Sequence, residues 1–255
     1  MSNIVAIVQA RTSSTRLPKK VLEPLGESCM LVEQIKRMQK AKTLSKIVVA
    51  TSDDPSDDAI EELCKEHDFY YFRGDLNNVL SRYYYCAKEH KADVVVRVTG
   101  DCPLIDPILM DQIIEFHLKK HSEYTSNARP ATYPDGLDVE VFSFLKLEDA
   151  FNNATLPSEK EHVSPYIFKN TKDFLNFENT EDFSKLRVTV DNKEDLEVVR
   201  AVFNELSKEE NFGYQEIIQF LVNNPEISKL NSSYVRNEGS LKSLEEDKKF
   251  LSENN

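Results

Sequence analysis

The sequence predicts an α/β protein in which helices cover both faces of a mostly parallel β-sheet. Short apolar, β-branched runs alternate with longer segments whose apolar residues recur at helical spacing. Repeated strand–helix–strand units give a parallel sheet, and ligands bind at the carboxyl ends of its strands. The composition agrees, because 255 residues with 40% hydrophobic content can bury one substantial core.

The first half of the chain carries the clearest alternation. Each apolar run is followed by a polar loop and then by a helical pattern, so the loops after the strands are the segments to inspect for function. The predicted strands span 4–8, 46–51, 69–73 and 93–98, the predicted helices 30–42, 57–67, 78–90 and 107–120, and the loops of interest 9–20, 51–54, 73–77 and 99–106.

Beyond about residue 122 the pattern loosens, and we expect this half to supply the pocket for a second substrate. Residues 1–225 would form the catalytic domain, and residues 226–255 a polar, partly ordered tail. The predicted strands here are 124–127, 137–143, 173–178 and 187–191, and the predicted helices 159–169 and 195–207.

The charge balance limits the partners. With 44 acidic and 32 basic residues, a net charge of -12 and a pI near 5.0, the long-range field repels nucleic acid and anionic membranes. An anionic small ligand therefore needs a local basic site. No C-x-x-C spacing, secretory signal pattern or apolar stretch of the ~18 to 20 residues that span a bilayer occurs, so we expect a reduced, cytoplasmic protein.

The loop after the first strand is a candidate phosphate-binding site. Its cations Arg11, Arg16, Lys19 and Lys20 stand among four hydroxyl side chains, and with backbone N–H groups they could share the charge of a triphosphate. The alternative is a solvated basic turn. Neither G-x-x-x-x-G-K-[ST] nor G-x-G-x-x-G occurs, so P-loop and dinucleotide-binding Rossmann folds lose support.

Two aspartates follow apolar runs and are candidates to hold Mg²⁺. Asp101 comes after the strand at 93–98, and a carboxylate there can hold Mg²⁺ against phosphate oxygens. Asp191 ends the run 187–190 and is the natural partner. The alternative for Asp101 is a turn-stabilising role, whereas Asp106 is better explained as the cap of the next helix.

Polar residues of the second half are candidates for binding the second substrate. Asp138 and Glu140 alternate along a strand, so both could accept hydrogen bonds from sugar hydroxyls or amines, or form a solvated face. Arg187 could pair with a substrate carboxylate or with a neighbouring acid. His162 is either functional or a surface residue at a helix start.

Two further groups are better explained without a ligand. His117 and His121 have the spacing of a zinc pair, but no third ligand is evident, which favours a solvated helix face. The acidic residues Asp53, Asp54, Asp57 and Asp58 fit a turn and a helix first turn, capped by Ser56, better than they fit a cation site.

Taken together, these segments resemble the cytidylyltransferases that activate acidic sugars, which include the CMP-KDO and CMP-sialic acid synthetases. Closest in appearance is the branch named for spore coat polysaccharide biosynthesis protein F. The likeness covers about residues 3–225 and rests on the order and spacing of several motifs. These are Gln9-Ala10-Arg11 with Ser14, Arg16, Pro18 and Lys20; Arg73-Gly74-Asp75 with Val79 to Tyr83; Gly100 to Ile105; Tyr133 to Glu140; Glu161 to Tyr166; and Arg187 to Asp191 with Glu194-Asp195-Leu196.

The resemblance implies a three-layer αβα nucleotidyltransferase that moves CMP from CTP to a sugar, with release of pyrophosphate, for a cell-surface polysaccharide or glycan. It implies catalytic roles for Arg11, Arg16 and Lys20 on the triphosphate, Mg²⁺ on Asp101 and Asp191, and a homodimer. The expected nucleotide-binding residues are Gln9, Ala10, Arg11, Ser14, Arg16, Lys20, Arg73, Arg97, Thr99, Gly100 and Asp101, and the expected substrate-binding residues Tyr133, Asp138, Glu140, His162 and Arg187.

One position departs from the family's pattern. The KDO enzymes carry glutamine before the Gly-Asp pair, whereas this chain has Thr99. Thr99, Arg73 and backbone groups could read cytosine instead, and another pyrimidine stays open. Two other functions also stay open: a GT-A glycosyltransferase, although its D-x-D motif is replaced by Asp101-Cys102-Pro103, and a non-catalytic nucleotide-binding subunit, against which Asp101 and Asp191 argue.

Overall fold

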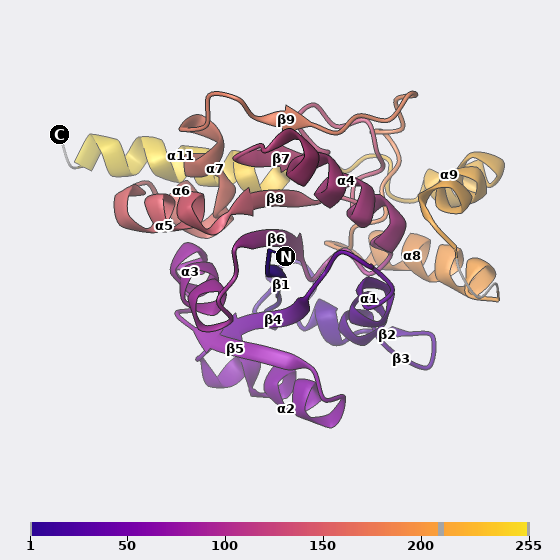
Figure 1. The fold of residues 1–255 in the computed structure, drawn as a ribbon. Coiled ribbons are helices and arrows are strands. Elements are labelled where there is room, and N and C mark those ends of the chain that lie inside the picture. Colours follow the sequence, from indigo (N-terminus) through magenta and orange to yellow (C-terminus); the bar gives the residue numbers. More distant parts are fainter. Residues whose placement is uncertain (1, 209–211, 254–255) are drawn as a thin grey trace.

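A seven-stranded sheet in the order β5-β4-β1-β6-β8-β7-β9 forms the centre of the protein (Figure 1). The structure is a computed structural model that describes residues 2–208 and 212–253. Neighbouring strands pair in parallel except where β8 meets β6 and β7, which confirms the mostly parallel sheet. The strands are β1 (Ile4–Gln9), β4 (Lys46–Ser52), β5 (Tyr70–Gly74), β6 (Val94–Thr99), β7 (Tyr124–Ser126), β8 (Glu140–Ser143) and β9 (Leu175–Asn176), with a separate hairpin of β2 (Pro24–Leu25) and β3 (Ser28–Cys29).

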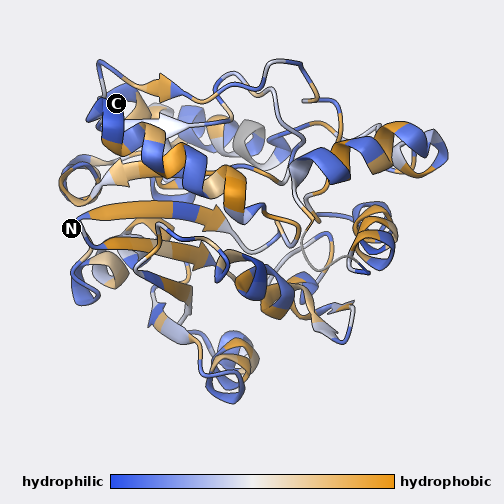
Figure 2. Ribbon diagram, turned by 45° about the vertical axis from the view of Figure 1, so that its right-hand side comes forward, coloured by the Kyte–Doolittle hydropathy of each residue, from blue (hydrophilic) through white to orange (hydrophobic). Residues whose placement is uncertain are grey.

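Helices cover both faces of this sheet and give three layers. Alternate side chains of β1 serve the two layers: Ala6 and Val8 pack on one side, Val5 and Ile7 on the other, and all are fully buried. Figure 2 shows the apolar residues gathered on the central strands. One face carries α1 (Met30–Met38), α2 (Asp58–Glu66), α4 (Pro107–Lys120), α8 (Lys193–Leu206) and α9 (Tyr214–Asn223); the other carries α3 (Val79–Glu89), α5 (Phe144–Asn153) and α7 (Ser164–Lys169).

Helix starts follow the capping chemistry of the sequence. The Asp106 carboxylate accepts hydrogen bonds from the backbone N–H groups of Ile108 and Leu109 at 2.7 and 3.2 Å, which confirms Asp106 as the cap of α4. The helix predicted at 159–169 is interrupted at Val163, whose φ of 66° ends α6 (Pro157–His162) before α7 begins. Helix α5 was not predicted.

Residues 187–191 do not form the predicted strand. A single bridge joins Arg187 to Asp135, and the Val190 N–H donates to the Asp101 carbonyl at 2.8 Å. Gly136 makes this packing possible, because its φ is 104° and a Cβ there would lie 2.4 Å from the Thr189 nitrogen. The segment is therefore held against a turn and against the loop after β6, not within a strand ladder.

The C-terminal segment folds back onto the rest of the protein. Residues 225–228 form α10 (Pro225–Ser228), and residues 238–253 form α11 (Glu238–Glu253), which lies along α6. The buried Ser158 N–H donates to Asp247 Oδ1 at 2.9 Å, which ties the two helices together. Across the described residues, no helix combines the length and the apolar character needed to cross a bilayer.

Candidate active site

A cleft of about 880 Å³ opens at the carboxyl ends of β1 and β6. Gln9 and Thr99, the last residues of these strands, are register partners, so the loops that follow start side by side. A Cβ on Gly100 would lie 2.9 Å from the Gln9 carbonyl oxygen, which is why the second loop needs glycine to pass this close to β1. The basic loop and Asp101 thus face one cavity.

Lys20 joins the two aspartates that were expected to meet here. Its Nζ donates to Asp101 Oδ2 at 2.9 Å, to Asp191 Oδ1 at 2.8 Å and to the Val190 carbonyl at 2.8 Å. Burial opposes charge on each group, but the attraction between the Lys20 ammonium and the two carboxylates outweighs it. The pKa of Lys20 is raised, that of Asp101 is lowered, and that of Asp191 is lowered to about 2. All three are therefore charged at neutral pH.

Asp101 and Asp191 offer a donor set that suits Mg²⁺. Carboxylate oxygens are hard ligands, and Mg²⁺ usually takes one or two of them together with water and substrate phosphates. In the described part of the chain no three His, Cys, Asp or Glu side chains converge on one point, so phosphate oxygens and water would complete the coordination. The Lys20 ammonium contacts both carboxylates, so a cation already lies between them.

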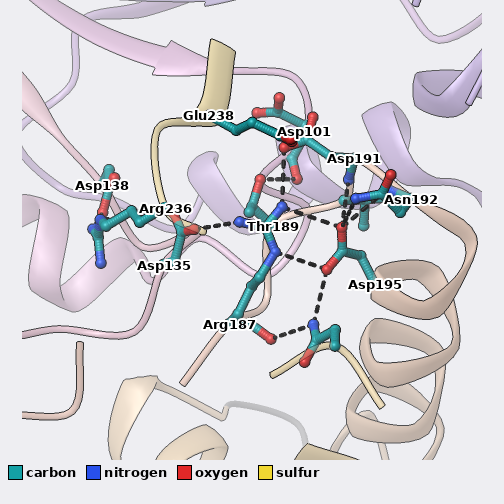
Figure 3. Close-up of polar contacts among 12 residues, drawn as sticks. Asp101, Asp135, Asp138, Arg187, Thr189, Asp191, Asn192, Asp195, Arg236 and Glu238 are labelled. Atoms are coloured by element: carbon teal, nitrogen blue, oxygen red, sulfur yellow. Dashed lines mark hydrogen bonds and ion pairs between the residues drawn. The ribbon is translucent and has the colours of Figure 1, made fainter. Parts of the chain in front are cut away.

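Arg187 fixes the carboxylate of Asp191 (Figure 3). Its Nη2 lies 3.0 Å from Asp191 Oδ2, its Nε 2.8 Å from Asp195 Oδ1 and its Nη1 2.5 Å from Asp135 Oδ2. Asp195 also accepts the backbone N–H groups of Asp191 and Asn192 at 3.0 Å. Arg187 was expected to pair either with a substrate carboxylate or with a neighbouring acid, and the structure shows the neighbouring acids. Asp195 belongs to a motif of the family resemblance, but no role at the site was predicted for it.

The two arginines of the basic loop reach across the cleft. Arg11 Nη2 lies 3.1 Å from Glu161 Oε1 on α6. Arg16 Nη2 lies 2.8 Å from Asp191 Oδ1, and its Nη1 pairs with Glu238 at the start of α11. An incoming anion that binds these arginines would therefore displace the carboxylates that contact them.

Asp57 anchors the start of the same loop. Its side chain is fully buried, and Oδ1 accepts the Thr12 N–H at 2.7 Å and the Thr12 hydroxyl at 2.9 Å. Its other oxygen accepts from Ser52. The interpretation of Asp57 as a first-turn residue missed this contact. Asp54, not Ser56, caps the short 3-10 helix Pro55–Asp57 by accepting the Ser56 N–H at 2.9 Å.

A second hollow of about 310 Å³ adjoins the cleft and shares Arg16, Thr99, Asp101, His162 and Asp191 with it. Its floor is a buried polar cluster in which Glu140 is bound by Arg97 and by the Tyr124 hydroxyl, each at 2.5 Å. Burial raises the pKa of Glu140, but Arg97 and Arg129 outweigh it and the pKa is lowered.

Asp138, like Asp135, is an acid of the second hollow whose pKa is raised by burial. Arg236, from the segment before α11, donates to its carboxylate and to the Tyr133 carbonyl. Burial nevertheless raises the pKa of Asp138 to about 7, with Asp135 and Glu140 adding repulsion that Arg236 does not cancel.

Most of the expected site residues lie around these two hollows. Thr99 donates its hydroxyl to Asp101, so this side chain is engaged at the carboxylate. The cleft is lined by Gln9, Ala10, Arg11, Ser14, Arg16, Lys20, Thr99, Gly100 and Asp101, and the second hollow by Arg97, Asp138, Glu140, His162 and Arg187.

Two expected residues lie elsewhere. Arg73 lines neither hollow, because it lies on the outer strand β5. There α2 supplies Glu61 as its partner, and the Arg73 Nε donates to the Ser52 carbonyl at 2.8 Å. Tyr133 is buried in the core, with its ring centroid 5.4 Å from that of Tyr214.

His117 does not lie on a solvated face. Its imidazole is buried, and Nδ1 lies 3.0 Å from the Thr125 hydroxyl on β7. Burial lowers the pKa of His117 to about 4. His121 is exposed at the end of α4, so the two imidazoles do not share an environment.

The basic loop after β1 faces two carboxylates, Asp101 on the loop after β6 and Asp191 on the segment that packs against that loop. A family model described as cytidylyltransferase matches residues 5–239. The chain belongs to the cytidylyltransferase family and is therefore a nucleotidyltransferase enzyme, which sets aside the glycosyltransferase and the non-catalytic subunit.

Known proteins of similar sequence and fold agree with this assignment. Spore coat polysaccharide biosynthesis protein SpsF of Bacillus subtilis is 34% identical over 235 residues, 89% of this chain and 97% of that protein. The solved structure of a cytidylyltransferase from Leptospira borgpetersenii is 32% identical, with a TM-score of 0.85 over 93% of this chain and 98% of that one. That of CMP:2-keto-3-deoxy-manno-octonic acid synthetase complexed with CTP shares the fold, with 17% identity and a TM-score of 0.61 over 80% of this chain and 99% of that one. The resemblance noted from the sequence is thereby confirmed.

Proposed function

We propose that this protein transfers CMP from CTP to a hydroxyl group of an acidic sugar, with Mg²⁺ bound at Asp101 and Asp191. The observation that carries the proposal is the cleft in which Arg11, Arg16 and Lys20 face these two carboxylates. Cations and metal-binding oxygens gathered in one cleft suit a triphosphate better than a neutral ligand.

In the proposed reaction the sugar oxygen bonds to the α-phosphorus, the bond from that phosphorus to the bridging oxygen breaks, and pyrophosphate leaves. Such a step needs neutralised charge and in-line positioning more than covalent help. Arg11, Arg16 and Lys20 supply positive charge to the phosphates. Bound Mg²⁺ would add charge and lower the pKa of the attacking hydroxyl, which loses its proton as the bond forms.

The second hollow is the proposed site of the sugar. It adjoins the cleft at Asp101 and Asp191, so a hydroxyl group held there would face the α-phosphate. The carboxylate of Asp138 and the arginines of this hollow suit a ligand with many hydroxyl groups and an acidic group. The name of the KDO synthetase of similar fold points to the same substrate class.

The proposal is tested first with nucleotides alone. CTP, UTP, GTP and ATP are compared for thermal stabilisation, each with Mg²⁺ and with EDTA. A ligand at 100 times its Kd adds about 2.7 kcal/mol, which is readily measured. Selective stabilisation by CTP with Mg²⁺ is expected, followed by pyrophosphate release when sugar acids are added. Preference for another nucleotide, or release without a metal, would contradict the proposal.

The remaining expectations belong to the same proposal. They are a catalytic domain of residues 1–225, a cytoplasmic homodimer joined through the second half of the chain, and a role in making a cell-surface polysaccharide or glycan. The likeness to a protein named for spore coat polysaccharide biosynthesis supports the last of these. Light scattering on the purified protein tests the dimer, and a monomeric mass at micromolar concentration would contradict it.

A further inference from the structure

Helices α6 and α11 form the wall of the cleft opposite the basic loop. The cleft-lining residues of α11 recur every three or four positions, so they occupy one face of the helix. The match to the family model ends at residue 239, and most of this face lies beyond it. The lining residues are Glu238, Gly239, Lys242, Ser243, Glu246 and Phe250 from α11, and Pro157, Lys160, Glu161 and His162 from α6.

This wall is held in place by polar contacts between the two helices. Ser158 binds Asp247, and a hydrogen bond of 2.9 Å joins His162 Nε2 to the Ser243 hydroxyl. Asp247 and Ser243 are 6% and 7% exposed, so these contacts are shielded from water. These contacts fix α6 and α11 relative to each other, and thereby the backbone positions of the side chains that project from the wall.

Two lysines of the wall differ from the three loop cations that line the cleft. Arg11, Arg16 and Lys20 are each paired with at least one carboxylate. Lys160 and Lys242 line the same cleft, and their side chains form no hydrogen bond or ion pair with any residue that the structure describes. They are cations that an incoming anion can bind without displacing a partner.

Their positions put them beside the contact points of the loop. Lys160 precedes Glu161, which binds Arg11, and Lys242 lies one helical turn beyond Glu238, which binds Arg16. Phosphates that take these arginines leave Glu161 and Glu238 without partners. The two lysines then compensate for both carboxylates and for the added charge.

We propose that Lys160 and Lys242 bind the terminal phosphates of the nucleotide, so that α11 completes the triphosphate site. The inference rests on the proposed function, because it assumes a triphosphate along the basic loop. Glu246 tests whether charge is the cause, because a carboxylate should affect nucleotide binding in the opposite direction to a lysine. It lines the cleft one turn beyond Lys242, and its carboxylate repels the same phosphates.

The test is calorimetric binding of CTP and of CMP, both with Mg²⁺, to the full chain. Lys160→Met and Lys242→Met each weaken CTP binding roughly tenfold and leave CMP within about twofold, because one charge-assisted contact to a terminal phosphate is lost. Glu246→Gln binds CTP as tightly as the wild type or more tightly. Lys248→Met, on the same helix but outside both hollows, changes neither ligand.

Failure of this inference can be told from failure of the proposed function. If wild-type protein binds CTP and both lysine variants match it, the lysines do not bind phosphate and the proposed function stands. A second result also overturns the inference: the lysine variants weaken the binding of CTP and of CMP equally, or Glu246→Gln weakens CTP binding as the lysine variants do. Either result would mean that the wall contributes shape and not charge. No binding of CTP by the wild type removes both proposals.

Discussion

Arg187 holds Asp191 by the oxygen that Lys20 leaves free. Arg187 Nη2 lies 3.0 Å from Oδ2 of Asp191, while Lys20 Nζ lies 2.8 Å from Oδ1. The carboxylate is thus fixed from two sides, and Arg187 is itself held by Asp195 and Asp135. A proposed metal ligand is in this way tied to a buried ion network, so its geometry depends on Asp135 and Asp195 as well as on Arg187.

Arg187→Met should strongly destabilise the protein. The substitution leaves Asp195 buried without its cation and Asp135 with only Arg236 at 3.8 Å, and breaking such a network by removing one partner typically costs about 3 to 5 kcal/mol. Urea unfolding measures the loss. Arg200→Met is the matched control, because Arg200 pairs with Glu23 near the surface and should cost less than about 1 kcal/mol. Equal losses in the two variants would mean that the network contributes no more than a surface pair.

Asp101→Asn should remove turnover and preserve the fold. The amide is nearly the same size but lacks the charge that faces Lys20 and that would hold Mg²⁺. We expect pyrophosphate release to fall about a hundredfold or more, on the scale of losing a charged group at the reacting centre. Circular dichroism and thermal unfolding check the fold. Release at the wild-type rate would exclude Asp101 from the mechanism.

Asp57→Ala should loosen the basic loop. The Thr12 N–H loses its acceptor, whereas the Thr12 hydroxyl keeps the Ser56 carbonyl, and an unsatisfied buried donor costs about 1 to 3 kcal/mol. CTP binding should weaken as well, because Arg11 directly precedes the anchored Thr12. Asp58→Ala is the control: Asp58 is exposed and pairs with Arg73, away from the cleft. If both variants bind CTP like the wild type, Asp57 supports the fold and does not position the loop.

The sequence could predict those parts of the site whose positions are set by the end of a strand. Asp101 lies at the cleft because β6 ends at Thr99, and the basic loop faces it because Gln9 and Thr99 are register partners. The contacts of Asp57 and Asp195 could not be predicted, because short-range patterns explain both as helix-start residues. Their burial arises from loops that pack only in the folded chain.

The wall of the cleft, formed by α6 and α11, could not be predicted from the sequence for a different reason. Helix α11 is polar, and its contact with α6 depends on Ser158, Asp247, His162 and Ser243, so no apolar pattern marks the side that packs. His162 was left open between a surface and a functional residue. It lies at the junction of both hollows, where burial lowers the pKa of its imidazole and Arg97 adds to that effect.

His117 should make stability depend on pH in a defined window. Burial lowers its pKa to about 4 from an ordinary value near 6.5, so between these values the unfolded chain binds a proton that the folded protein does not. The free energy of unfolding therefore falls as pH is lowered from about 6.5 to 4, by up to about 3 kcal/mol from this group. Below pH 4 its contribution changes no further.

The comparison is between wild type and His117→Asn, whose amide can keep a hydrogen bond to Thr125 without titrating. The advantage of the wild type over the variant in urea unfolding should shrink as pH falls from 7 to 4, since other groups titrate alike in both proteins. His121→Asn, at the left-handed end of α4, which asparagine tolerates, should follow the wild-type pH dependence. A constant difference between wild type and His117→Asn from pH 7 to 4 would show that His117 accepts a proton as readily in the folded state as in the unfolded chain.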